Sequence, residues 1–203
     1  MNKGIIKAKG EYLNFMNSGD CFYDNEVLSN VYQNGMCSEM IVGKDYHFDE
    51  KTEKDFSSIL PIEISSLFLY VATLPHQSTF FKKQLFDKFM YDENLKIVSD
   101  WKFYIQQIII NGCSVQYYNN NVCRREPDGI CSELPQLMFN ERNIVLKELY
   151  PIGIRNDFDR LCLLEKDVID KLFYLCKNLV TRKTIKYLIR IIYKIDVIIR
   201  KYI

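Results

Sequence analysis

The stretch Tyr12-Leu13-Asn14-Phe15-Met16-Asn17-Ser18-Gly19-Asp20 decides the fold class of this chain. Its first five residues are mostly apolar and follow a glycine, which predicts a short buried strand. The polar residues 17–20 predict a turn directly after that strand. In open α/β sheets, ligands bind at the carboxyl ends of strands. We therefore expect Asp20 at a binding site, where its carboxylate can hold Mg²⁺ or Mn²⁺. The structural alternative is a turn or helix-capping aspartate.

The rest of the chain alternates between strand-like and helix-like segments. Asp100 is expected to cap a helix over 101–110, and the triplet Asn119–Asn121 to form a turn between two strands. Further helices are predicted over 25–31, 83–89 and most of the chain beyond 133, and strands over 40–42, 46–48, 79–81, 114–118 and 122–125. Alternating elements predict an α/β fold.

Composition excludes several classes of protein. The chain has 203 residues, 48% of them hydrophobic and 26% charged, which is typical of a globular protein. The net charge of +1 speaks against a general nucleic-acid binder, and we expect no nucleic-acid partner. No uncharged run reaches the roughly 20 residues of a membrane span. The N-terminus lacks a signal-peptide pattern. Seven scattered cysteines without a Cys-x-x-Cys pair favour reduced thiols and a cytoplasmic location.

The last part of the chain is strongly basic. Residues 177–203 carry eight basic side chains and one acidic one, whereas the other 176 residues carry 19 basic and 25 acidic ones. From 183 to 203, helical spacing places apolar residues on one face and lysines and arginines on the other. Such a helix binds anionic membrane surfaces, or it packs on the protein with a solvated basic face. Membrane binding would make the protein peripheral at the inner face of the membrane.

Two further segments carry candidate site residues. His76 and Gln77 lie between Pro75 and a predicted strand, where an imidazole could bind a metal or a phosphate, or be structural. Asp100 precedes Trp101, the only tryptophan of the chain. A carboxylate at that position could act as a general base, and the indole could stack on a sugar ring. The structural alternative is helix capping by the aspartate and core packing by the tryptophan.

The order of these motifs resembles that of glycosyltransferase family 2. The resemblance rests on Asn2-Lys3-Gly4-Ile5, Asn17-Ser18-Gly19-Asp20, Pro75-His76-Gln77-Ser78-Thr79-Phe80-Phe81, Ser99-Asp100-Trp101 and Asp128-Gly129-Ile130-Cys131-Ser132. It covers residues 2–132 and implies a partial GT-A fold, a Rossmann-like mixed sheet with helices, over 1–132. A helical extension over 133–203 would follow, with the basic tail at its end.

The resemblance also implies an activity and a role for each matching residue. The reaction would be inverting sugar transfer from a nucleotide-sugar to a saccharide or lipid-linked acceptor, in bacterial surface polysaccharide or glycolipid synthesis. The implied catalytic base is Asp100, and the implied ligands of Mn²⁺ or Mg²⁺ are Asp20 and His76. Donor contacts are expected from Asn17, Ser18 and Gly19, and acceptor contacts from Gln77 and Trp101.

The chain departs from the family pattern at its start. Family members carry a nucleotide-binding half of two βα units before the segment that matches Asn2–Ile5. The sequence has no counterpart of that half. We therefore also expect an alternative, a truncated non-catalytic chain or a subunit that depends on a partner. The strand over 12–16 would then lack parallel neighbours, and the exposed edge would favour self-association.

Overall fold

A computed structural model describes residues 1–49, 54–125 and 130–163. The chain forms two compact units, Met1–Leu149 and Tyr150–Ile203. In the second unit, residues 152–163 are helical, and the rings of Tyr150 and Phe158 lie 5.8 Å apart. The predicted loop over 127–129 and the basic segment over 183–203 lie outside the described residues. In the described part of the chain, no helix combines the length and apolar character needed to cross a membrane.

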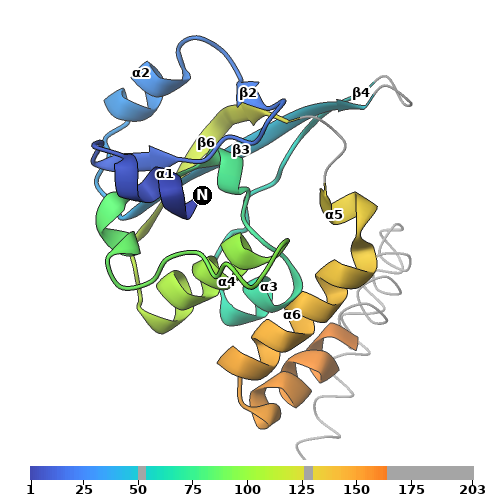
Figure 1. The fold of residues 1–203 in the computed structure, drawn as a ribbon. Coiled ribbons are helices and arrows are strands. Elements are labelled where there is room, and N and C mark those ends of the chain that lie inside the picture. The colour runs from blue at the N-terminus through green and yellow to red at the C-terminus, as the bar shows by residue number, and fades with distance from the viewer. Residues whose placement is uncertain (50–53, 126–129, 164–203) are drawn as a thin grey trace, which may run out of the picture. The chain divides into compact units, whose positions relative to one another are not determined.

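The first unit is a mixed α/β fold (Figure 1). Its helices are α1 (Asn2–Lys7), α2 (Val27–Gln33), α3 (Ser66–Val71), α4 (Ser99–Tyr104), α5 (Ile130–Glu133) and α6 (Pro135–Leu149). Shorter turns are the 3₁₀ segments η1 (His76–Ser78) and η2 (Lys83–Phe86), and the π-helical segment η3 (Ile105–Ile110). The strands are β1 (Tyr12–Asn14), β2 (Cys21–Phe22), β3 (Met40–Asp49), β4 (Lys54–Ser57), β5 (Thr79–Lys82) and β6 (Val115–Arg124).

The strands form one sheet in the order β1-β5-β3-β6-β2, with β4 paired to β3. Among the described strands, β3 and β6 pair in parallel, whereas the other pairs are antiparallel. The predicted α/β class is confirmed at this level. In the described chain β1 pairs with β5 alone, so the strand before the Asn17–Asp20 turn lies at an edge of the sheet.

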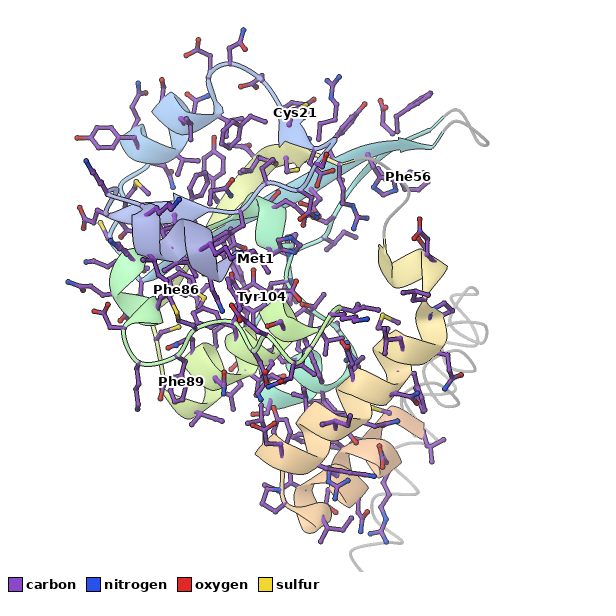
Figure 2. The ribbon with its side chains drawn as sticks, viewed as in Figure 1. Met1, Cys21, Phe56, Phe86, Phe89 and Tyr104 are labelled. Atoms are coloured by element: carbon purple, nitrogen blue, oxygen red, sulfur yellow. The ribbon has the colours of Figure 1, made fainter. Side chains whose placement is uncertain are left out.

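Side chains point alternately to the two faces of the sheet along each strand, and buried side chains pack against both faces. On one face, Val27 and Val31 of α2 pack with Ile41, Phe80 and other buried side chains of β3, β5 and β6. On the other face, the ring of Phe81 lies 5.7 Å from that of Tyr104 and 5.9 Å from that of Phe103. Adjacent residues of a strand point to opposite faces, so the pair Phe80–Phe81 serves both cores. Figure 2 shows Phe86 and Tyr104 among these side chains.

Two expectations about strands are wrong. The segments 40–42 and 46–48 belong to one strand, β3, whose register shifts between Val42 and Asp45. The predicted turn at Asn119–Asn121 is absent, because β6 runs unbroken from Val115 to Arg124 along β3. Asparagines favour turns, and here they lie in an irregular part of the ladder, where residues 118–120 of β6 stand opposite Gly43 alone.

The helix boundaries also differ from the prediction. The segment predicted over 83–89 is the short 3₁₀ turn η2. The helix of Asp100 begins at Ser99, so Asp100 lies in its first turn and Val98 is its N-cap. This helix continues into η3 and has Asn111 as its C-cap, and the next residue, Gly112, adopts a φ of 68°. The first compact unit extends to Leu149 and so includes α6.

Candidate active site

A cavity of about 980 Å³ opens in the first unit. Three segments that lie far apart in the sequence contribute polar side chains to it: Asn17, Ser18 and Asp20 from the turn after β1, His76 and Gln77 from η1, and Asp100 and Trp101 from α4. The loop over 91–98 and the segment over 58–61 complete much of its wall. The structure therefore brings together the residues of the three predicted motifs, with one exception: Gly19 does not line the cavity.

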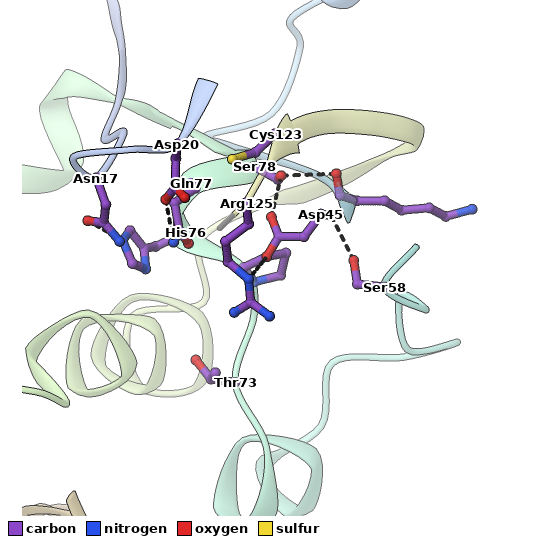
Figure 3. Close-up of polar contacts among 12 residues, drawn as sticks. Asn17, Asp20, Asp45, Ser58, Thr73, His76, Gln77, Ser78, Cys123 and Arg125 are labelled. Atoms are coloured by element: carbon purple, nitrogen blue, oxygen red, sulfur yellow. Dashed lines mark hydrogen bonds and ion pairs between the residues drawn. The ribbon is translucent and has the colours of Figure 1, made fainter. Parts of the chain in front are cut away.

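The turn after β1 is closed by its own backbone. The amide of Asp20 donates to the carbonyl of Asn17 at 3.2 Å, and Gly19 adopts a φ of 94°. That conformation favours glycine. The side chains then face η1: Gln77 Nε2 donates to Asp20 Oδ2 at 3.1 Å, and Asn17 Oδ1 lies 3.3 Å from His76 Nε2 (Figure 3). Gln77 thus orients the Asp20 carboxylate.

The side chains of His76 and Asp100 meet in the cavity. His76 Nδ1 lies 2.9 Å from Asp100 Oδ2, and the two side chains are 18% and 16% exposed. The other carboxylate oxygen, Oδ1, accepts the backbone N–H of Trp101 at 2.8 Å. Oδ1 therefore has a donor and Oδ2 faces an imidazole nitrogen, and each oxygen keeps a second lone pair. A carboxylate held in this way can accept a proton from a hydroxyl group in the cavity.

Trp101 is more buried than its predicted stacking role requires. Its side chain is 2% exposed, and its indole N–H donates to the carbonyl of Leu69 at 2.7 Å. The guanidinium of Arg142 lies 4.0 Å from the ring centroid and donates to the carbonyl of Tyr70. Burial lowers the pKa of Arg142, and the nearby Asp100 charge opposes that shift. Stacking of a sugar on this ring would require Arg142 to move.

Sequence reasoning missed Asp45, a buried carboxylate that lines the cavity. Asp45 is 5% exposed, and its Oδ1 accepts from Ser78 Oγ at 2.6 Å. Arg125 Nε lies 4.0 Å from its other oxygen (Figure 3). Burial raises the pKa of Asp45, whereas the Ser78 hydrogen bond and Arg125 lower it. The sequence carried no signal for it, because Asp45 lies between the predicted strands 40–42 and 46–48, whereas the structure joins them in β3 and buries it.

The predicted metal ligands fit a cation unequally. Mg²⁺ typically keeps several waters and takes one or two carboxylates together with phosphate oxygens. Asp20 suits that role, because its carboxylate lines the cavity and is oriented by Gln77. His76 does not, because both of its ring nitrogens already face other side chains. Among the described residues, no group of three His, Cys, Asp or Glu side chains converges on one point.

Comparison with known proteins adds no family to these observations. No protein-family model matches the chain, and no curated protein matches it.

Proposed function

We propose that this protein transfers a sugar from a nucleotide-sugar to an acceptor hydroxyl, with inversion at the anomeric carbon. One observation carries the proposal: Asn17, Asp20, His76 and Asp100, which come from three distant segments, line a single cavity. The cavity of about 980 Å³ has the size of a site for a substrate larger than a simple metabolite. The order of the same motifs resembles that of glycosyltransferase family 2.

Asp100 is the proposed base. An acceptor hydroxyl attacks the anomeric carbon and gives its proton to an oxygen of Asp100 as the new glycosidic bond forms. The bond between the anomeric carbon and the diphosphate breaks, and the nucleoside diphosphate leaves with the electron pair. The carboxylate is held from two sides, by His76 and by the Trp101 amide, which keeps it in one orientation during this step.

Asp20 marks the proposed donor end of the cavity. Asp20 would hold Mg²⁺ or Mn²⁺, and such a cation supplies positive charge to the departing diphosphate. Gln77 fixes the carboxylate for this purpose, and the Asn17–Asp20 turn presents its exposed residues to the donor. Arg125, half-exposed at 44% and lining the cavity, adds a second positive charge on that side.

Part of the cavity wall is apolar, and we propose that it binds the acceptor. Phe68, Leu74 and Met138 line it, together with the Ile59–Pro61 segment. A saccharide or a lipid-linked acceptor suits such a wall, as surface polysaccharide or glycolipid synthesis would require. The basic segment over 183–203 is proposed to bind the anionic membrane surface that carries a lipid acceptor.

Donor binding tests the proposal without knowledge of the acceptor. Thermal unfolding is measured with UDP or GDP and Mn²⁺, for the wild type, Asp20→Asn and the control Asp87→Asn. Asp87 is exposed and does not line the cavity. At a hundredfold excess over Kd, the ligand is expected to raise the unfolding midpoint by about 5–10 °C.

The Asn variant keeps an oxygen for the Gln77 hydrogen bond but loses the charge that holds the cation. We expect Asp20→Asn to lose the Mn²⁺-dependent stabilisation, and Asp87→Asn to retain it. If no nucleoside diphosphate stabilises the wild type, donor binding by this chain is refuted. The alternative of a non-catalytic chain or partner-dependent subunit would then stand.

A further inference from the structure

We propose that His76 is a positioning residue, which fixes the Asp100 carboxylate by donating from Nδ1 to Oδ2, two atoms that lie 2.9 Å apart. The inference rests on the proposed function, because it assigns a task to Asp100. It differs from the role that the sequence suggested for His76, namely a ligand of the cation. The contacts of both ring nitrogens carry it.

Two donors at two different oxygens define the orientation of Asp100. Trp101 N–H holds Oδ1 at 2.8 Å, and His76 Nδ1 holds Oδ2 at 2.9 Å. With one donor alone, the carboxylate can rotate about its last torsion, which is broad for aspartate. His76 removes that freedom, and it does so where both side chains are less than one-fifth exposed, so water competes weakly for the bond.

The second ring nitrogen is held as well. Asn17 lies 3.3 Å from His76 Nε2. If Nδ1 carries the proton of a neutral imidazole, Nε2 is an acceptor, and the Asn17 amide can present its NH₂ group there. The oxygen and the NH₂ of the Asn17 amide have nearly the same size, so they can exchange places without any other movement of the side chain. In the structure it is Oδ1 of Asn17 that faces Nε2, so the amide must turn by 180° for this tautomer. Asn17 then accommodates the tautomer that donates to Asp100 and does not select it.

The backbone that carries the imidazole is also anchored. The amide of Ser78 and the hydroxyl of Thr79 both donate to the carbonyl of Pro75, at 3.2 and 2.7 Å. The buried Tyr104 hydroxyl donates to Thr79 Oγ1 at 2.9 Å. Tyr104 belongs to α4, the helix of Asp100. The Tyr104–Thr79 hydrogen bond thus joins α4, which carries Asp100, to the segment that follows His76. We infer that packing between these two segments sets the distance from the imidazole to the carboxylate.

The tautomer of His76 can be measured directly, because the chain has two histidines only. Ring ¹⁵N spectra of histidine-labelled protein at about pH 8.5, where a free imidazole is neutral, are assigned with the variant His47→Asn. The His47 ring stacks on Phe56, 5.2 Å away, and does not line the cavity. We expect the His76 proton on Nδ1 in the wild type.

Asp100→Ala removes the carboxylate that faces His76 Nδ1. Asp100→Asn keeps the shape of that side chain but not its charge. Asp100→Ala is expected to shift the His76 ring signals and abolish the preference for Nδ1–H, whereas the exposed-site control Asp87→Asn leaves both unchanged. A His76 proton on Nε2 in the wild type, or ring signals that neither Asp100 variant alters, would overturn the inference. This readout needs no substrate, so its failure is distinct from failure of donor binding.

Rates of nucleoside diphosphate release from a sugar nucleotide give the functional test. In His76→Asn the amide nitrogen can take the place of Nδ1 and donate to Asp100, whereas His76→Leu cannot donate. His76→Leu is expected to lower kcat about 10²-fold with little change in KM. The kcat of His76→Asn is expected to be at least about tenfold higher than that of His76→Leu. Equal losses in both variants, or a loss confined to KM, would overturn the positioning role. Thermal unfolding establishes that the compared variants are folded.

Discussion

Glu141 of α6 makes the strongest single polar contact between that helix and the loop that leads to Asp100. Its side chain is 5% exposed. One carboxylate oxygen accepts the amide of Lys96 at 2.8 Å, and the other accepts those of Ile97 and Val98 at 2.9 and 3.2 Å. Three consecutive N–H groups around one anion form a nest. Replacing Glu141 should therefore destabilise the loop and the start of α4 together.

The expected loss follows from these bonds. A hydrogen bond to a charged group contributes about 1.5–3 kcal/mol, and its loss leaves amide donors without a partner. Because the three bonds share one carboxylate, their contributions do not add fully. We expect Glu141→Ala to lower the free energy of unfolding by about 4 kcal/mol. Glu141→Gln keeps one acceptor oxygen for Ile97 and Val98, and should cost about half of that.

Urea unfolding followed by tryptophan fluorescence is the assay, because Trp101 is the only tryptophan and is buried in the first unit. Glu133→Gln, at an exposed position of α5, is the matched control and should change stability by less than about 0.5 kcal/mol. A loss below about 1 kcal/mol in Glu141→Ala would refute the reasoning, since the nest would then contribute no more than an exposed contact.

Three further predictions concern the sheet, the buried carboxylate and the tail. In Gly43→Ala the new Cβ would collide with Val122, so we expect the free energy of unfolding to fall by about 1–3 kcal/mol. In Gly4→Ala the new Cβ meets open space, and we expect no loss. Urea unfolding of the two variants and the wild type is the measurement. Burial raises the pKa of Asp45, so its ionisation opposes folding. Asp45→Asn should therefore raise the free energy of unfolding at neutral pH. Unfolding measured against pH should show this gain disappearing below about pH 4, where the wild-type carboxyl is protonated in both states. A gain that grows on acidification would contradict this explanation. The chain should co-sediment with anionic but not neutral vesicles at low salt, and deletion of residues 183–203 should abolish this; equal sedimentation of the deleted chain would contradict it.

The sequence pattern identified residues that line one cavity better than it identified the bounds of the elements around them. Asp20, His76 and Asp100 could be singled out because each follows or precedes an apolar run or a turn residue, and these are local signals. Their convergence on one cavity could be expected only from the family resemblance, since it depends on strand order. The single strand β6 could not be predicted, because the triplet Asn119–Asn121 has a local turn preference, which the structure accommodates as an irregularity within the strand.

Contacts between side chains were the least predictable part of the site. His76 lies against Asp100, and it is Gln77 that bonds to Asp20. This arrangement depends on contacts between distant segments, for which the sequence carries no local signal. Asp45 was missed because it lies at the register shifts between β3 and β6, which have no sequence pattern of their own. Trp101 was expected on the surface of the cavity, but Arg142, from a helix some forty residues later, covers one face of its ring.

The rate of sugar transfer with and without the Asp100 carboxylate tests the central claim most directly. Release of nucleoside diphosphate from a donor that stabilises the protein is measured with an alkyl glycoside acceptor, for the wild type and Asp100→Asn. The account predicts that Asp100→Asn binds the donor as tightly as the wild type but turns it over about 10²–10⁴-fold more slowly. An Asp100→Asn variant with wild-type turnover would contradict it.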